Sequence, residues 1–446
     1  MCGIAGILTL NNTSIINLQD HLELMNEKQK HRGSDGKGIF ISPKSDVGFA
    51  HVRLAILDLE GGKQPMSDVF GNTIIFNGQI YNASILRKEI GSAYPFKTHN
   101  SDTEIILAGF KIWGEKILER LEGMFAFVVY EGKTGKSFFA RDHMGIKPFY
   151  YTIQGNNLFF SSEAKTLLSF LPSKQIDEDA LKDYIAFQYY TFDKTLFKGV
   201  KILEAGYCGF IKNGVLEIKQ YCDISFNNKI QITEEEAILE TERLIVNSVK
   251  KHLISDVPVS SYISGGIDSS LIASIVAKEQ GITEGYCGFF PNFPDFSENN
   301  YAKEVALNCK IKLNEVPITE DDYISDLEKA HFFLDTPMVG YGLLNNFKMA
   351  EVVSKKYKVV FSGSGGDEIF GGYTRYLSTF FVTSLKEAIN GNKNNLQNIL
   401  PALEGLKNYK QVLNDLFVSN IFNLSDDELF YKTISRMENA GIRFES

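Results

Sequence analysis

Short apolar runs separated by turns dominate the first half of the chain. From residue 124 onward, runs rich in apolar and aromatic residues alternate with turns rich in Gly, Asn and Lys. The runs are residues 124–130, 136–142, 148–154 and 158–163. This spacing predicts a meander of β-strands joined by hairpins. Helical periodicity near residues 18–29 and 103–121 adds helices, and the combination predicts an α+β layered domain.

The pattern changes after residue 222. A polar stretch at residues 223–232 predicts a linker. Thr233 and Glu236 then have the spacing of a capping box, which predicts that a helix starts here and runs to about residue 252. The residues that the apolar face of this helix would bury are Ile238, Ile245 and Val249.

Two later segments share one pattern of apolar strand, glycine turn and helix start. They are residues 257–279 and 358–373. Strands that alternate with helices predict a parallel sheet whose ligands bind at the carboxyl ends of the strands. We therefore expect a first domain over residues 1–222, the linker over 223–232, and an α/β domain over 233–446.

Composition and charge exclude several classes of protein. The formal net charge of −9 argues against a nucleic-acid-binding protein, which would present a basic face. We expect no membrane partner, since no apolar run is long enough to span a bilayer. The N-terminus has no secretory signal, and the five cysteines are scattered without metal-like spacing. These features predict a cytoplasmic protein with reduced thiols.

Candidate chemistry begins at Cys2. Removal of Met1 would leave a thiol and a free α-amine on one residue, which is a compact pair of nucleophile and base. Further segments follow in order: HRGSDG (31–36), AHVRLAILD (50–58), QPM (64–66), FNGQIYN (76–82), SDTE (101–104), RDHMGIKPFYY (141–151) and SSEAKTLL (161–168). With these segments, residues 1–222 resemble the glutaminase domain of asparagine synthetase and other class II amidotransferases, which carry an N-terminal nucleophile in an αββα fold.

The resemblance implies a role for each residue of a glutamine site. Cys2 would attack the side-chain amide of glutamine, and Asn77 with the backbone N–H of Gly78 would form the oxyanion hole. Arg53 would bind the α-carboxylate and Asp102 the α-ammonium. Taken singly, these residues also fit blander interpretations, since Asn-Gly is an ordinary hairpin turn and an Arg–Asp pair is common on surfaces.

One residue of this site departs from the family pattern. Gln79 stands where the family usually has a Glu that helps to bind the α-ammonium. An amide oxygen still accepts a hydrogen bond, but charge-assisted hydrogen bonds are about twice as strong. We therefore expect weaker glutamine binding without loss of hydrolysis.

The first of the two glycine-rich patterns, at residues 264–270, indicates nucleotide chemistry. Glycines allow the backbone to approach phosphate oxygens, and a carboxylate beside phosphates indicates an intervening Mg²⁺. The sequence SGGIDSS after a strand resembles the pyrophosphate loop of ATP-pyrophosphatases, which asparagine synthetase joins to this glutaminase. The residues that the resemblance assigns to ATP are Ile263, Ser264, Gly265, Gly266, Asp268, Ser269, Ser270, Cys287 and Gly363, and those that it assigns to Mg²⁺ are Asp268 and Asp367.

The second half departs from the family in two places. Ser364 replaces an acid of the family's S-G-[ED]-G-x-D-E pattern, and a hydroxyl cannot act as a carboxylate base at neutral pH. Family members also continue through an R-V-P-F-L-D-type segment and a catalytic lysine, which we do not find before Ser446. We therefore expect a C-terminally shortened ATP-pyrophosphatase domain.

The resemblance implies a glutamine-dependent ligase of asparagine biosynthesis. It would hydrolyse glutamine, convert ATP to AMP and pyrophosphate, and amidate a carboxylate acceptor, with aspartate as the default. The alternatives are a glutaminase with an impaired synthetase half, a paralogue that amidates another carboxylate, and a non-catalytic nucleotide-binding subunit. The expected partners are glutamine, ATP and the acceptor, with a second copy of the chain as a further candidate.

Overall fold

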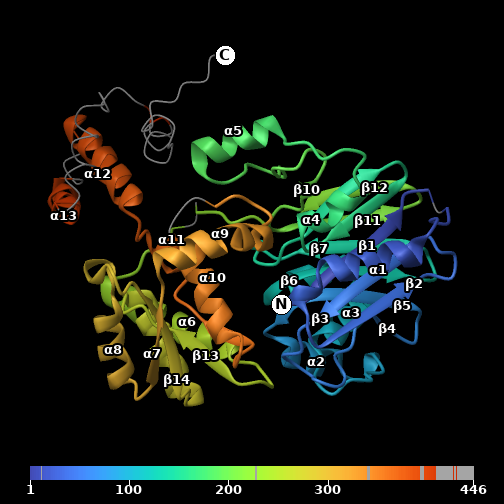
Figure 1. The fold of residues 1–446 in the computed structure, drawn as a ribbon, viewed down its shortest axis with the longest axis horizontal. Coiled ribbons are helices and arrows are strands. Elements are labelled where there is room, and N and C mark those ends of the chain that lie inside the picture. The colour runs from blue at the N-terminus through green and yellow to red at the C-terminus, as the bar shows by residue number, and fades with distance from the viewer. Residues whose placement is uncertain are drawn as a thin grey trace.

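The chain folds into two layered units (Figure 1). The computed structural model describes residues 1–11, 13–226, 229–338, 342–391, 396–407, 425 and 428. Two six-stranded sheets form the first unit and a four-stranded sheet forms the second. The N-terminus lies on the side of the first unit that faces the second (Figure 1).

The first unit is an αββα sandwich. One sheet contains β10 (Lys201–Ile202), β8 (Tyr150–Gln154), β9 (Asn157–Ser161), β1 (Gly3–Thr9), β3 (Val47–Arg53) and β2 (Gly36–Ile41), in that order. The other contains β12 (Val215–Gln220), β11 (Tyr207–Lys212), β7 (Lys136–Arg141), β6 (Gly123–Glu131), β5 (Asn72–Ile80) and β4 (Met66–Ser67). All neighbouring strands run antiparallel. This architecture confirms the expected fold of the first domain.

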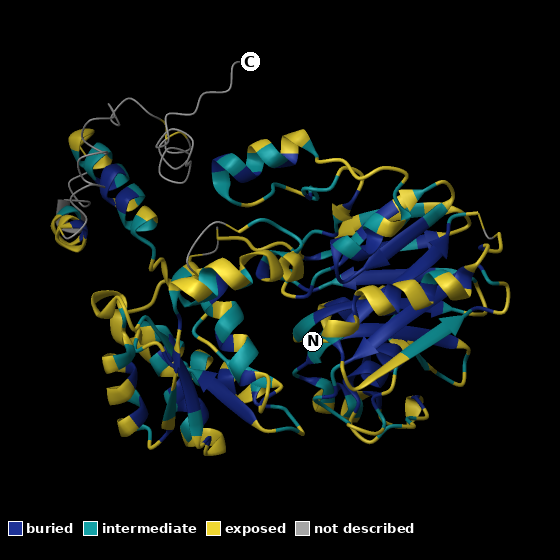
Figure 2. Ribbon diagram, viewed as in Figure 1, coloured by how far each residue is buried: buried dark blue, intermediate teal, exposed yellow. Residues whose placement is uncertain are grey.

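Strand alternation explains why the sheets pack on each other and on helices. In β1, Ile4 and Leu8 point into the core between the two sheets, whereas Ile7 points to the helix layer. Helix α1 (Leu18–Lys28) covers that outer face, and helices α2 (Ala83–Ile90) and α3 (Asp102–Trp113) cover the second sheet. Figure 2 shows that the strands between these layers are buried.

The predicted meander divides between the two sheets. Strands β6 and β7 form one hairpin, and β8 and β9 form another, as the turn signals predict. The two hairpins nevertheless belong to different sheets. A single meander is therefore wrong, because the segment between β7 and β8 leads from one sheet to the other instead of making a turn within one sheet.

The second unit contains the predicted parallel sheet. Its strands are β15 (Lys312–Pro317), β14 (Glu284–Phe289), β13 (Val259–Tyr262) and β16 (Val359–Phe361), in that order, and all pairs are parallel. The helices of this unit are α6 (Glu234–His252), α7 (Ile267–Gln280), α8 (Asn299–Asn308), α9 (Glu320–Leu334), α10 (Gly342–Val353), α11 (Gly366–Phe370), α12 (Thr374–Ile389) and α13 (Leu396–Leu406). Two short helices of the first unit, α4 (Ala164–Leu167) and α5 (Glu178–Phe187), complete the α-helices.

Helix α6 follows its sequence signals at both ends but not along its whole face. The capping box of Thr233 and Glu236 is formed, and the helix ends at His252. Val249 is buried against the parallel-sheet core as predicted. Ile238, in contrast, is 59% exposed, because only the later turns of the helix pack on that core.

Two further expectations concern the C-terminus of the chain and membrane-spanning helices. The expected shortening of the second domain concerns the end of the chain, and residues 429–446 lie outside the described residues. In the part of the chain that the structure describes, no helix is long and apolar enough to cross a membrane.

Candidate active site beside Cys2

The predicted glutamine-site residues line one pocket. Cys2 lies just before β1, where its Sγ accepts a hydrogen bond from the Leu54 N–H at 3.4 Å. The pocket has a volume of about 240 Å³, below the range typical of drug-sized ligands. The predicted residues that line it are Cys2, Arg53, Asn77, Gly78, Gln79 and Asp102. Burial raises the pKa of the Cys2 thiol, against the hydrogen bond from Leu54, so the resting thiol needs a base.

Asn77 presents an unused donor to this pocket. Its side chain is 1% exposed, and its Nδ2 has no hydrogen-bond partner among the described residues. Asn77 and Gly78 lie inside β5, opposite Ala126 and Phe125 of β6, so the hairpin-turn interpretation is wrong. A buried donor without a partner costs free energy, which favours a ligand oxygen at this position.

Backbone carbonyls hold the Arg53 guanidinium in place. Nη1 donates to the Leu59 carbonyl at 2.8 Å, and Nη2 donates to the Asp58 carbonyl at 2.6 Å and to the Leu57 carbonyl at 3.3 Å. Arg53 is buried at the end of β3, and Asp102 is buried at the start of α3. The two therefore do not form an ordinary ion pair on the surface. The guanidinium has five donor hydrogens, and those not used on the 57–59 loop remain for an anion.

Asp102 begins α3 and faces the same pocket. Its Oδ2 accepts a hydrogen bond from the Ile80 N–H at 3.1 Å. Burial raises the pKa of Asp102 to about 6, although this bond and the charge of Arg53 act in the opposite direction. The carboxylate is therefore ionised at neutral pH and can receive a cationic group.

Gln79 joins the pocket beside Cys2 to the second unit. Its Nε2 donates a hydrogen bond to the Ile254 carbonyl, between α6 and β13. Two residues further on, Asp256 accepts a hydrogen bond from the Asp58 N–H at 2.7 Å. The segment 254–256 therefore fixes both Gln79 and the loop that holds Arg53.

The residues that the second unit contributes to this pocket could not be identified from the sequence. Lys358, Val359 and Val360 line its wall. Lys358 Nζ lies 2.7 Å from Asp35 Oδ2, which also accepts a hydrogen bond from the Ala55 N–H. In the sequence, these residues stand out only because they lie just before the glycine-rich pattern at 362–366. That position gives no information about their contacts with the first unit.

A second, more open hollow lies away from this chemistry. It measures about 730 Å³ between α1 and residues 33–39, and none of the predicted site residues lines it. Its rim carries both signs of charge, from Glu23, Glu27, Lys30 and Lys37. The smaller pocket beside Cys2 therefore remains the candidate active site.

The first glycine-rich loop connects β13 to α7, as the sequence predicts. Gly265 has φ of 90°, and a Cβ there would lie 2.4 Å from the Tyr301 Cβ, so the loop requires glycine. Ser269 Oγ accepts a hydrogen bond from the Ser264 N–H at 3.1 Å, which closes the turn. Ser270 Oγ is buried without a partner among the described residues.

The second loop packs directly against the first. A Cβ on Gly363 would lie 2.5 Å from the Ser269 N, and one on Gly366 would lie 2.5 Å from the Asp268 Cγ. The strand ends therefore bring the two glycine-rich segments together at the carboxyl edge of the parallel sheet. Asp367 follows directly in α11.

The remaining residues assigned to ATP lie differently. Ile263 and Cys287 are buried, and their side chains belong to the core of the second unit. Only their backbone could therefore face a nucleotide. No cluster of three or more metal-ligating side chains occurs among the described residues.

Each half of the chain matches the model of a known protein family. A model of the glutamine amidotransferase domain matches residues 1–222, and a model of asparagine synthase matches residues 240–432. Asparagine synthetase (glutamine-hydrolyzing) 1 of Bacillus subtilis is 34% identical over 414 residues, which cover 91% of this chain and 64% of that protein. A Methanocaldococcus jannaschii protein that bears the provisional name asparagine synthetase (glutamine-hydrolyzing) 2 is 31% identical, with 87% and 78% covered.

A relative with a different name matches over a similar length. Amidase chry2 of Gibberella zeae is 30% identical over 407 residues, which cover 84% of this chain and 60% of that protein. The chain therefore spans between 60% and 78% of the length of these three relatives.

Proposed function

The chain belongs to the family of glutamine-hydrolysing asparagine synthetases, and on that premise we propose that it is a glutamine-dependent, ATP-consuming amidotransferase. Cys2 hydrolyses glutamine, and the ammonia attacks a carboxylate that ATP has activated by adenylation, with release of AMP and pyrophosphate. The observation that carries the proposal is the buried Asn77 Nδ2, which has no hydrogen-bond partner among the described residues and lies in the pocket of Cys2, Arg53 and Asp102.

The first half-reaction follows from these residues. The Cys2 thiol gives its proton to the α-amine, and Sγ attacks the amide carbon of glutamine. Asn77 Nδ2 and the Gly78 N–H donate to the developing oxyanion. The α-ammonium then returns the proton to the leaving nitrogen, ammonia departs, and water hydrolyses the thioester to glutamate.

The α-amine must be neutral to act as this base. Burial, with the cations Arg32 and Lys147 nearby, lowers the pKa of the Met1 amino group to about 5. Once Met1 is removed, the amino group of Cys2 experiences the same cations, because Arg32 bonds the Cys2 carbonyl. The charge of Arg32 therefore disfavours protonation of this amine.

In the second half, the two adjoining loops provide the nucleotide site. The first turn of α7 and Ser264, Ser269 and Ser270 donate to phosphate oxygens. Asp268 and Asp367 would hold a Mg²⁺, since that ion combines one or two carboxylates with phosphate oxygens. When bound, the ion would neutralise charge on the pyrophosphate that leaves.

Strand β16 connects the two proposed centres. Val359 and Val360 line the pocket of Cys2, and Ser364 follows four residues later in the nucleotide loop. The chain from Lys358 to Ser364 is seven residues long, and β16 forms three of them. An ammonia molecule that leaves Cys2 would follow this strand to reach the acceptor.

The acceptor, the compartment and the assembly are further parts of the proposal. Aspartate is the default acceptor. We place the protein in the cytoplasm, in keeping with its five free thiols. A homodimer remains a prediction.

A glutaminase with an impaired synthetase half is the second candidate. Ser364 favours it, because its Oγ accepts a hydrogen bond from Ser362 Oγ at 3.0 Å and offers no carboxylate to the nucleotide loop. A panel of carboxylates, assayed with ammonium chloride in place of glutamine, separates the candidates. The proposal expects release of AMP and pyrophosphate with one acceptor, whereas no ATP turnover with any acceptor would leave the glutaminase alone.

A further inference from the structure

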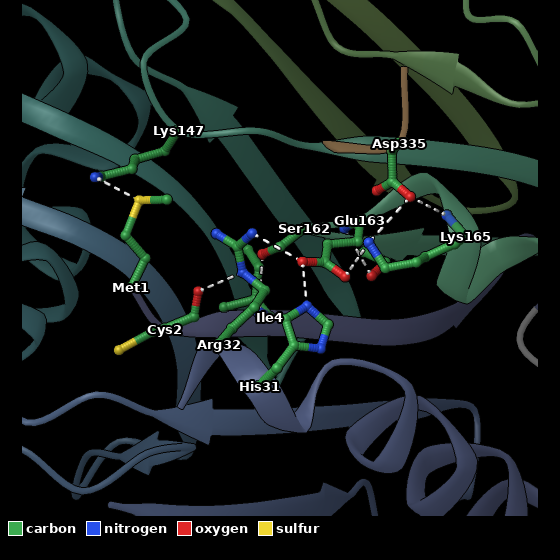
Figure 3. Close-up of polar contacts among 11 residues, drawn as sticks. Met1, Cys2, Ile4, His31, Arg32, Lys147, Ser162, Glu163, Lys165 and Asp335 are labelled. Atoms are coloured by element: carbon green, nitrogen blue, oxygen red, sulfur yellow. Dashed lines mark hydrogen bonds and ion pairs between the residues drawn. The ribbon is translucent and has the colours of Figure 1, made fainter. Parts of the chain in front are cut away.

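A group of charged side chains, buried at Glu163 and exposed at His31, lies between Cys2 and the second unit (Figure 3). Its centre is Glu163, which follows β9. Glu163 Oε1 lies 2.8 Å from His31 Nε2 and accepts a hydrogen bond from Arg32 Nη1 at 3.1 Å. Glu163 Oε2 forms an ion pair with Lys165 Nζ at 2.7 Å. One carboxylate thus contacts three basic side chains.

The group extends to Cys2 at one end. Arg32 Nε donates to the Cys2 carbonyl at 3.0 Å, while Nη1 of the same guanidinium binds Glu163. Figure 3 shows Arg32 between the backbone of Cys2 and the carboxylate. The backbone of the nucleophile is therefore held by a side chain that Glu163 orients.

At the other end the group reaches the second unit. Lys165 Nζ lies 3.1 Å from Asp335 Oδ1, and the Lys165 N–H donates to the same oxygen at 3.2 Å. Asp335 caps the C-terminus of α9 with φ of 61°. A continuous series of polar contacts thus runs from Cys2 through Arg32, Glu163 and Lys165 to Asp335.

Residues of α9 enclose this series. The ring of Phe333 packs edge-on against His31, with centroids 4.9 Å apart. Lys165 Nζ lies 5.2 Å from the ring centre of Phe332. Thr336, next to Asp335, donates a hydrogen bond to the Tyr190 hydroxyl at 2.9 Å.

This environment shifts the pKa values of the carboxylates of Glu163 and Asp335 in opposite directions. Burial opposes ionisation of Glu163, but hydrogen bonds from His31 and the charges of Lys165 and Arg32 lower its pKa to about 2. Burial raises the pKa of Asp335, although its cationic partner Lys165 acts in the opposite direction. Buried ion pairs recover little stability after desolvation, so stability alone does not explain an arrangement of five ionisable groups.

We propose that Glu163 and Lys165 are positioning residues through which Asp335 of the second unit sets the pose of Cys2. The inference rests on the proposed glutaminase activity. When α9 docks, Asp335 contacts Lys165. Lys165 and Arg32 both contact Glu163, and Arg32 holds the Cys2 carbonyl. Glutamine hydrolysis is then efficient only when the second unit is docked, which limits the loss of ammonia.

Substitution of Asp335 tests this series. Asp335→Asn keeps the shape of the side chain and removes its charge. We expect kcat for glutamate release to fall about tenfold, less than the ~100-fold that a 1 Å misplacement of reacting groups costs. The KM for glutamine should stay within about twofold, because Arg53 and Asp102 bind the substrate.

A second variant and a matched control complete the experiment. Lys165→Gln removes the ion pair between Lys165 and Asp335 by a change in the first unit. If one of the two variants does not fold, the other still tests the proposal. The double variant should lose no more activity than the Lys165→Gln single variant, because the two act in series. Glu122→Gln removes an exposed ion pair with Lys251 that also joins the two units, and it should change neither constant.

The outcomes separate the inference from the function on which it rests. If the wild-type chain releases glutamate and Asp335→Asn and Lys165→Gln keep its kcat, the positioning role is overturned and the glutaminase stands. Losses that multiply in the double variant, or an equal loss in Glu122→Gln, also overturn it. If the wild-type chain releases no glutamate, both proposals fall together.

Discussion

Substitution of Gln79 by Glu tests how this chain binds glutamine. In the structure Gln79 Nε2 donates to the Ile254 carbonyl, which a carboxylate cannot do. A Glu at this position would be repelled by that carbonyl and would turn toward the pocket, which Gln79 already lines. There it would gain a charged contact with the α-ammonium of glutamine.

The size of the effect follows from the charge that the carboxylate adds. The α-ammonium is charged in both cases, and attraction between two unit charges about 4 Å apart in a water-like dielectric contributes about 1 kcal/mol. The difference of about 1 kcal/mol corresponds to a roughly fivefold lower KM for glutamine. The kcat should change little, because neither Cys2 nor Asn77 is altered.

Steady-state glutamate release at varied glutamine concentration measures both constants. Gln79→Met is the matched control, because it also removes the bond to Ile254 but adds no charge, so its KM should not fall. An unchanged or higher KM in Gln79→Glu would refute the reasoning, since the carboxylate would then not contact the substrate.

Three further predictions concern the two sites. Asp102 must be ionised to hold the α-ammonium, and its pKa is about 6. We therefore expect kcat/KM for glutamine to fall as the pH drops through 6, and we expect Asp102→Asn to flatten this acidic limb of the pH profile. An unchanged acidic limb in the variant would assign the limb to another group. Asn77→Ala should lower kcat about 100- to 1000-fold with little change in KM, and a loss confined to KM would remove Asn77 from the oxyanion hole. Asp268→Asn should lower ATP-dependent pyrophosphate release more than about tenfold, measured with ammonium chloride, while glutamate release stays intact; equal losses in both assays would indicate a general structural defect.

Local patterns were sufficient to predict much of the fold. The helix of residues 18–29, the capping box at Thr233 and the strand–glycine–helix units all depend on neighbours within a few residues. The division of the hairpins between two sheets depends instead on which faces pack together across the core. Ile238 is a similar case, since the apolar period does not reveal how much of α6 the rest of the unit covers.

The candidate site shows the same division. Cys2, Arg53, Asn77 and Asp102 could be chosen because their types and order match one chemistry, and the structure brings them to one pocket. The contribution of Lys358 and the charges around Glu163 could not be predicted. Apart from the local pair of Glu163 and Lys165, their partners lie more than 100 residues away in the chain, and a charged residue at a strand end is usually solvated.

Loss of the nucleophile tests the central claim most directly. The purified chain should be incubated with glutamine and compared with its Cys2→Ala variant for glutamate release, with mass spectrometry of the N-terminus to confirm removal of Met1. We expect glutamate release by the wild-type chain, none above background in the variant, and ATP turnover with ammonium chloride retained in both. Glutamate release that persists in Cys2→Ala would contradict the account.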